Sequence, residues 1–302
     1  MSARAVIIDT DPGLDDAIAI LFALASPDLS VKAVTTVAGN IGLDRTTLNA
    51  GSLLAAAGHD EIPVAAGAAR PLTGRGITEE GVHGDDGLGG VMLPAPMRRP
   101  EKLAAHDFMA KLLLARPSGS LDILALGPLT NLALLLQEHT DAAGRIGRVI
   151  AMGGAVREPG NVGPRSEFNL ACDPEAAAIV MDSGLDLTLI PLDVTRKIRA
   201  DRAYLDRLRA SGSLPGAVGA DLIAAYFAGA RNRESRPLHD PCVMLQAVRP
   251  QLFDTRRMRL AVDCAAGPDR GALEPCNTVP EIAVALDVDA AAALDFLAEG
   301  LA

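Results

Sequence analysis

The fold of this chain is indicated most clearly by AVIIDTDPGLDDAIAILFALA, residues 5–25. Its first apolar run, Ala5 to Ile8, is typical of a buried strand, and the stretch from Asp15 to Ala25 is typical of a helix. Asp15 and Asp16 fall in the first turn of that helix, where the helix dipole favours acidic side chains. A strand, an acidic turn and a helix in this order predict the start of an alternating α/β chain.

The alternation continues along the chain. We predict strands at 31–37, 121–126, 148–152 and 187–191, helices at 44–57, 129–137 and 174–181, a mainly helical region at 201–247, and a return to the sheet at 258–262. This order predicts an α/β fold, with a mostly parallel open sheet, helices on both faces (Rossmann-like) and extra helices in the C-terminal part. Because we find no internal repeat or linker, we expect a single domain over residues 1–302.

Composition narrows the class of partner. The formal net charge is −10, and the aromatic residues are six Phe and two Tyr, with no Trp. An acidic chain without a basic stripe is a poor binder of nucleic acid, since phosphate attraction supplies most of the non-specific affinity. The balance favours a cation or a neutral small molecule.

The sequence also bears on location. It has neither the apolar core of a secretion signal at its N-terminus nor a run of roughly 20 apolar residues that would suit a membrane span. The four cysteines (172, 242, 264 and 276) form no CxxC pair and fit reduced thiols, although Cys264 and Cys276 are close enough to pair in an oxidising compartment. We expect a cytoplasmic protein that does not bind membranes.

Residues 9–16, DTDPGLDD, place four carboxylates within eight positions. Carboxylates this close repel one another, and some stay protonated unless a counter-charge is present. A hard divalent cation with oxygen ligands supplies that charge, and parallel sheets bind ligands at the carboxyl ends of their strands. A solvated turn that caps the helix is the simpler interpretation, because Asp and Gly are common in turns. For four acidic residues after one strand, we favour a metal site.

Six motifs in a fixed order resemble those of the nucleoside hydrolases, the inosine–uridine-preferring family that cleaves ribonucleosides into base and ribose. They are DTDPGLDDA at 9–17, VAGN at 37–40, VHGDDGLGG at 82–90, LGPLTN at 126–131, the GG, GN and EFN segments between 153 and 169, and LHDP at 238–241. The resemblance runs from the first strand to about Val243. Each motif alone is weak, but six in the right order are specific.

The resemblance implies a Ca²⁺ cofactor. Its ligands would be Asp11, Asp16, Asp240 and the backbone carbonyl of Leu126. Asp11 would also take a proton from the attacking, calcium-bound water, and His239 would protonate the leaving base. An imidazole suits that second task near neutral pH.

The resemblance also implies a pocket for a small-molecule nucleoside in a homo-oligomer, either a dimer or a tetramer. Asp15 would hold ribose hydroxyls and His83 would lie near the base. Cleavage of the N-glycosidic bond develops positive charge on the ribose, which nearby carboxylates stabilise. The residues expected to line this pocket are Asp15, Asn40, His83, Met152, Asn161, Glu167 and Asn169.

The sequence leaves the preferred base open. Tyr226 or Phe227, on the helix before LHDP, is placed to stack on a base, and Arg231 or Arg233 to contact it. A solvated helix end with Arg compensating the dipole explains the arginines equally well. The purine-specific subgroup sandwiches its base between Trp rings, so the lack of Trp argues against that subgroup. Pyrimidine, mixed and atypical nucleosides remain open.

Two other functions fit parts of the sequence. A haloacid dehalogenase-type Mg²⁺ phosphatase also begins with a strand and an Asp-x-Asp pair, and Asp9 would then be its nucleophile. A non-catalytic nucleoside- or ribose-binding protein on the same scaffold is the second. Three further histidines match no motif and are expected to be surface or structural residues: His59, His106 and His139.

Overall fold

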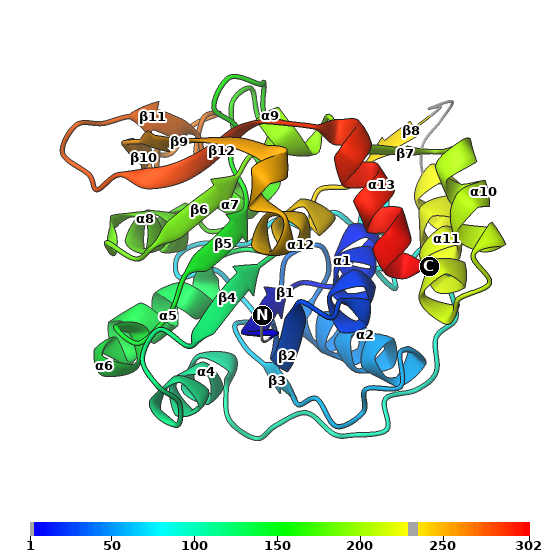
Figure 1. The fold of residues 1–302 in the computed structure, drawn as a ribbon. Helices are drawn as coiled ribbons and strands as arrows, with labels where there is room; N and C mark the ends of the chain where they lie inside the picture. The colour runs from blue at the N-terminus through cyan, green and yellow to red at the C-terminus, as the bar shows by residue number, and fades with distance from the viewer. Residues whose placement is uncertain (1–2, 229–234) are drawn as a thin grey trace.

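One eight-stranded sheet forms the centre of the molecule (Figure 1). The computed structural model describes residues 3–228 and 235–302. The strand order is β3-β2-β1-β4-β5-β6-β12-β9, and every neighbouring pair is parallel except β12 with β9. The predicted α/β fold with a mostly parallel sheet is therefore confirmed. The strands are β1 (Arg4–Thr10), β2 (Leu29–Thr36), β3 (Val64–Ala66), β4 (Leu121–Ala125), β5 (Val149–Met152), β6 (Leu187–Ile190), β9 (Phe253–Met258) and β12 (Ile282–Val288).

Helices cover both faces of the sheet (Figure 1). Successive side chains of a strand point to opposite faces, and β1 accordingly sends Val6 and Ile8 into one core and Ile7 into the other. The first core includes α1 (Leu14–Ala25), α11 (Leu214–Ala228), α12 (Pro241–Val248) and α13 (Ala290–Leu301). The second includes α4 (Ala105–Leu114), α5 (Thr130–Glu138) and α8 (Pro174–Asp182).

The remaining elements surround this frame. The other helices are α2 (Leu43–Ala56), α3 (Glu80–His83), α6 (Thr140–Ala143), α7 (Phe168–Cys172), α9 (Leu192–Thr195), α10 (Arg202–Ala210) and a 3-10 turn at Pro250–Leu252. Two small antiparallel pairs join β7 (Arg199–Asp201) to β8 (Ser235–Pro237) and β10 (Leu260–Val262) to β11 (Leu273–Pro275). The expected return to the sheet at 258–262 was therefore placed too late: the sheet strand ends at Met258, and Leu260–Val262 pairs outside it.

Asp122 ties three strands of the sheet together. Its buried carboxylate accepts hydrogen bonds from Nε of Arg4 on β1 and from Nε of Arg148 just before β5, both at 2.8 Å. A buried carboxylate is tolerated when charged donors satisfy it, which is the case here. The side chain is therefore structural.

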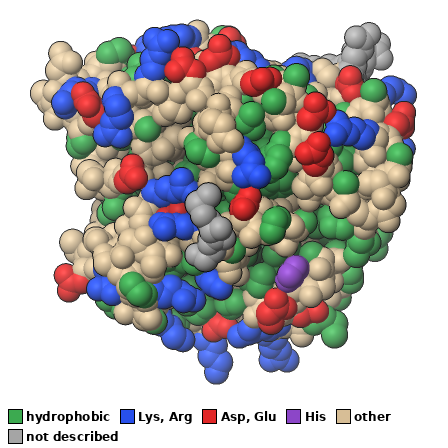
Figure 2. Space-filling model, in the orientation of Figure 1, with side chains coloured by type: hydrophobic (Ala, Val, Ile, Leu, Met, Phe, Trp, Pro, Cys, Tyr) green, Lys and Arg blue, Asp and Glu red, His purple; other side chains and the backbone are tan. Residues whose placement is uncertain are grey.

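The surface carries charges of both signs, and the cysteines are unpaired. Figure 2 shows acidic and basic side chains interspersed over the face it presents. The four cysteines are free, with Cys172 and Cys242 buried. In the part of the chain that the structure describes, we find no helix with the length and apolar character to cross a membrane.

Candidate active site

A pocket of about 420 Å³ opens at the carboxyl ends of the central strands. Ten of the twelve predicted site residues line it: Asp15, Asn40, His83, Leu126, Met152, Asn161, Glu167, Asn169, His239 and Asp240. Glu79, Phe168 and Tyr226 complete the lining, which among the described residues includes no Lys or Arg. The other two predicted residues, Asp11 and Asp16, are buried and are not part of this lining. The motifs thus converge on one acidic pocket, as the parallel sheet requires.

The turn between β1 and α1 is shaped by hydrogen bonds to Asp16. Its Oδ1 accepts from the hydroxyl of Thr10 at 2.6 Å, and its Oδ2 accepts from the backbone N–H of Gly13 at 3.0 Å. The side-chain amide of Asn40, which follows β2, donates to the same Oδ2 at 3.0 Å. These contacts close the first turn of α1 and fix the side chain of Asp16 in the site.

Three carboxylates meet in this site. One oxygen from each of Asp15, Asp16 and Asp240 lies within 4.8 Å of the others, and all three side chains are buried. Burial raises the pKa of Asp16 and Asp240, and repulsion from Asp15 raises both further. Crowded, buried carboxylate oxygens are the ligand set that a hard divalent cation prefers. The residues present therefore fit such an ion.

Asp11 is held next to this cluster. Its Oδ2 accepts the backbone N–H of Asn40 at 2.7 Å, and its own carbonyl accepts the Asn40 amide at 3.2 Å. Burial raises its pKa well above the usual range, and repulsion from Asp16 adds to the shift.

Two glycines make room for this carboxylate. A Cβ added at Gly39 would lie 2.9 Å from Cγ of Asp11, and one added at Gly127 would lie 2.8 Å from the same atom. Both distances are shorter than real Cβ contacts. The glycines of VAGN and LGPLTN are therefore explained by the close approach of their backbones to Asp11.

The predicted calcium ligand at Leu126 has a partner within the chain. Its carbonyl accepts the amide of Asn169 at 2.6 Å, and the same amide donates to the carbonyl of Met152 at 3.2 Å. These contacts hold the ends of β4 and β5 together at the pocket.

Glu167 lines the pocket but also caps α7. Its carboxylate accepts backbone N–H groups of Gly154, Asn169 and Leu170 at 2.9–3.3 Å. Burial nevertheless raises its pKa to about 7. Asn161 has a comparable local role, since its Oδ1 accepts the backbone N–H of Phe168 at 2.9 Å.

His239 differs from the sequence-based expectation. Its Nδ1 lies 2.7 Å from the hydroxyl of Thr195, and its backbone N–H donates to Oδ2 of Asp15 at 3.3 Å. Burial lowers the pKa of its imidazole to about 3, and the positive charge of Arg196 adds to the effect. The ring is therefore neutral at pH 7 in this structure, whereas we expected it to titrate near neutrality.

Two stacked rings, those of His83 and Tyr226, form one part of the pocket lining. The imidazole of His83 accepts the backbone N–H of Leu14 at Nδ1 (3.1 Å) and stacks on Tyr226, with centroids 6.2 Å apart. Arg236 lies over the Tyr226 ring at 4.6 Å. Phe227 is directed elsewhere, into a separate cavity with Leu205. Arg231 and Arg233 lie outside the described residues.

Sequence reasoning missed Glu79. It lines the pocket four residues before His83, which is one turn of helix, and its backbone N–H donates to the carbonyl of Asn40 at 3.0 Å. Burial raises its pKa. The four-residue spacing to His83 was the available signal, but Glu79 only caps α3, a helix of four residues.

Asp9 does not face the pocket. Its Oδ1 accepts the hydroxyl of Thr35 at 2.6 Å and the amide of Asn131 at 2.8 Å, and its side chain is buried. A nucleophile must reach its substrate, so this placement contradicts the phosphatase alternative.

Known proteins share both sequence and structure with this chain. The family described as inosine-uridine preferring nucleoside hydrolase matches residues 6–295. The pyrimidine-specific ribonucleoside hydrolase RihA of Citrobacter koseri is 39% identical over an alignment of 309 positions, which covers 99% of this chain and 98% of that protein. RihA of Salmonella arizonae is 38% identical, with the same coverage.

Solved structures agree over the whole chain. The plant nucleoside hydrolase PpNRh1 has a TM-score of 0.93 at 35% identity, and the purine-preferring ribonucleoside hydrolase from Gardnerella vaginalis has 0.91 at 31%. Each comparison covers 99% of this chain and 98% of the other. The acidic pocket therefore belongs to a chain whose sequence and fold match those of nucleoside hydrolases. These matches favour hydrolysis of nucleosides over both the phosphatase and the non-catalytic alternatives. This chain belongs to the inosine-uridine preferring nucleoside hydrolase family and is a ribonucleoside hydrolase, an enzyme that cleaves N-glycosidic bonds.

Proposed function

We propose that the pocket hydrolyses ribonucleosides with Asp11 as the proton acceptor and with Ca²⁺ held by Asp11, Asp16, Asp240 and the carbonyl of Leu126. The observation that carries this proposal is the meeting of Asp15, Asp16 and Asp240, whose carboxylate oxygens lie within 4.8 Å of one another, with Asp15 and Asp240 lining the pocket. Such an ion would neutralise the carboxylates, offer coordination to ribose hydroxyls and acidify a bound water.

Asp11 suits the task of removing a proton from water. Its buried carboxylate lies beside Asp16, next to the proposed ion, where it can accept a proton from a water bound there. Its hydrogen bond from Asn40 fixes one oxygen and therefore orients the other. Water then attacks C1′ of the ribose, and Asp11 receives the proton.

Ribose recognition and charge stabilisation fall to the other polar side chains. Asp15, Asn40 and Asn169 line the pocket with groups that can bind hydroxyls. As the N-glycosidic bond breaks, positive charge grows on the ribose, and Asp15 and Glu167 are the nearby carboxylates that oppose it. Met152, Phe168 and Asn161 shape the remaining wall.

His239 assists the leaving base as a neutral group. With the hydroxyl of Thr195 donating to Nδ1, we assign the ring proton to Nε2. An N–H at this position donates a hydrogen bond to the base as negative charge builds on it. This role agrees with the low pKa of the ring and keeps His239 as a donor to the leaving base.

We further propose a preference for pyrimidine ribonucleosides. Relatives named pyrimidine-specific match this chain at 38–39% identity, compared with 31% for the purine-preferring structure. The chain has no Trp with which to sandwich a purine. The stacked pair of His83 and Tyr226 instead supplies one aromatic surface for a single-ring base.

A base-release assay tests both proposals. Uridine, cytidine, inosine and adenosine are each incubated with the enzyme, with and without a calcium chelator, and the free base is measured by chromatography. We expect faster release from the pyrimidine nucleosides, loss of release with the chelator, and recovery when Ca²⁺ is restored. Faster purine release would overturn the base preference, and chelator-resistant release would overturn the metal assignment.

Substitutions of two neighbouring aromatic residues test where the base binds. Tyr226→Ala removes a ring that lines the pocket, whereas the matched control Phe227→Ala removes one that does not. We expect the first to raise KM for uridine and the second to leave KM unchanged. Equal effects would refute the assignment of Tyr226.

We also propose a cytoplasmic location and a homo-oligomeric assembly for this enzyme. Four free thiols support a cytoplasmic location, since reduced cysteines are usual there. The exposed side chains of Met92 and Met97 support a homo-oligomer, either a dimer or a tetramer, because exposed apolar groups favour contact between subunits. Light scattering of the purified enzyme measures its mass, and a monomer would contradict the second proposal.

A further inference from the structure

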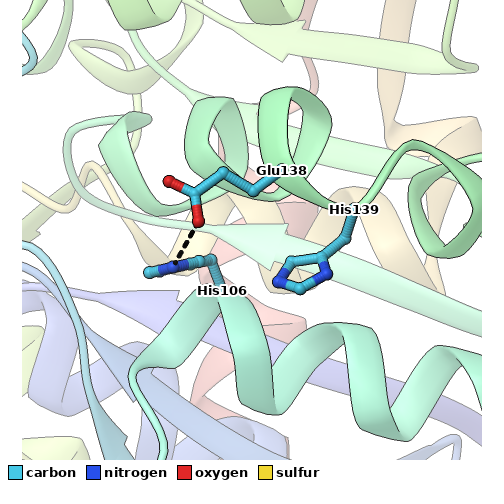
Figure 3. Close-up of side chains that lie close together, drawn as sticks. All are labelled: His106, Glu138 and His139. Carbon is cyan, nitrogen blue, oxygen red and sulfur yellow. Dashed lines mark ion pairs between the residues drawn. The ribbon is translucent and has the colours of Figure 1, made fainter.

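A second cluster of metal-binding side chains lies away from the nucleoside pocket. His106 is in the first turn of α4, Glu138 is the last residue of α5, and His139 follows it (Figure 3). One ligand atom from each of these three residues lies within 4.8 Å of the others. Asp107, next to His106, adds a carboxylate 2.8 Å from Nε2 of His139 and 3.9 Å from Nε2 of His106.

The cluster is separate from the catalytic pocket. α5 begins with Thr130, just after Leu126 of the pocket lining, and runs away from the carboxyl edge of the sheet for nine residues. At 1.5 Å per residue, its last residue lies about 12 Å along the axis from its first. An ion at the far end therefore cannot be the one that the catalytic carboxylates would bind.

The geometry suits a four-coordinate ion. Bonds of about 2.0–2.2 Å in a tetrahedral site place neighbouring ligand atoms about 3.3–3.5 Å apart. Nε2 of His106 already lies 3.3 Å from Oε2 of Glu138, the contact drawn in Figure 3. The other ligand atoms of the three residues lie within 4.8 Å of one another and must close by up to about 1.5 Å, which side chains that are partly exposed, such as His139 and Glu138, can do by rotation.

The environment also suits an ion. The ring of His106 is mostly buried and its Nδ1 has no hydrogen-bond partner among the described residues, so the polar contacts found there are made at Nε2, toward the cluster. Two carboxylates supply negative charge, and the exposure of Glu138 leaves a route for entry. Imidazole nitrogens select zinc and its transition-metal neighbours over Ca²⁺ and Mg²⁺, which prefer oxygen.

We propose that His106, Glu138 and His139, with Asp107 as the fourth ligand, bind a zinc-type divalent cation. The ion would link the start of α4 to the end of α5, two helices that pack against each other on one face of the sheet. Without the ion, the same side chains form two ordinary pairs, His106 with Glu138 and His139 with Asp107.

Titration with zinc alone tests the proposal. Metal-free protein is first saturated with Ca²⁺ to fill the catalytic site, and Zn²⁺ is then added in a calorimeter. We expect one zinc per chain in the wild type and loss of that event in the double variant His106→Ala/His139→Ala. Removing groups that only support a ligand weakens metal binding by about 10–100-fold, so loss of two ligands should weaken it by at least as much.

A matched control and a second variant make the result decisive. His59→Ala removes an exposed histidine that pairs with a single carboxylate, Glu61, at 3.1 Å, and it should retain zinc binding. His106→Gln/His139→Gln keeps donors for the two carboxylates, so it decides the question if the alanine pair fails to fold. Folding is checked by circular dichroism and by base release.

Two spectroscopic and thermal readouts complete the test. Co²⁺ in place of zinc should give the visible absorption of a four-coordinate site in the wild type and in His59→Ala only. Zinc should raise the melting temperature of the same two proteins, because a ligand that binds only the folded state stabilises it. Equal zinc binding by the wild type and a folded double variant, or no binding by the wild type, would overturn the proposal.

Discussion

Gly39→Ala tests the packing around Asp11. The new Cβ would lie 2.9 Å from Cγ of Asp11 and 2.9 Å from Cδ of Pro128, and closer still to Oδ2 of Asp11. Ordinary contacts are 3.4–4 Å. The carboxylate would therefore have to move by about 1 Å, and the backbone of Gly127 on its other side blocks an easy retreat. A misplacement of about 1 Å costs roughly 10²-fold in rate.

The assay is the steady-state hydrolysis of uridine, followed by release of uracil. We expect kcat for Gly39→Ala to fall by about 10²-fold, equivalent to about 2.7 kcal/mol in the activation free energy. The matched control is Gly42→Ala, because an added Cβ there meets nothing within 4 Å. Since crowding also destabilises the fold by about 1–3 kcal/mol, each variant is first shown to be folded by its melting curve. A folded Gly39→Ala enzyme with kcat within threefold of the wild type would refute this reasoning.

Two further predictions concern buried polar contacts. Burial raises the pKa of Asp9 to about 6, compared with an ordinary 3.8, so between these pH values the folded chain binds a proton that the unfolded chain does not. The free energy of unfolding of the wild type, relative to Asp9→Asn, should therefore fall by about 2.4 kcal/mol as pH rises from 4 to 7, measured by urea denaturation, and parallel pH curves would contradict this. Thr195→Val removes the hydroxyl beside Nδ1 of His239. We expect kcat to fall by roughly tenfold with KM unchanged, and Thr195→Ser to restore it, whereas a change in KM alone would point to a role in binding.

The sheet was predictable where its strands are buried on both faces. β1, β4 and β5 appear in the sequence as short apolar runs followed by Gly-rich or acidic turns, so their order and direction follow from pattern alone. The antiparallel edge strand β9 does not, because FDTRRM is mostly exposed and polar and carries no apolar pattern. Its place is set by pairing with β12, at the C-terminal end of the chain.

The site was predictable as a set of residues but not in its electrostatics. The six motifs brought ten residues to one pocket, because five of them follow strands of the same parallel sheet or lie in loops beside it, while LHDP follows the small strand β8 at the start of α12. The low pKa of His239 depends on its burial and on Arg196, neither of which a motif encodes. The orientation of Asp9 away from the pocket depends likewise on its hydrogen bonds from Thr35 and Asn131, which no motif encodes.

The central claim, that Asp11 accepts the proton of the attacking water, is tested most directly by Asp11→Asn. The substitution keeps the shape of the side chain and its hydrogen bond from Asn40 but removes the basic oxygen. Base release from uridine is measured in ¹⁸O-labelled water for the wild type and the variant. We predict that wild-type ribose carries one ¹⁸O and uracil none, and that kcat of the folded variant falls by about 10²–10⁴-fold. A folded Asp11→Asn enzyme with kcat within tenfold of the wild type would contradict the account.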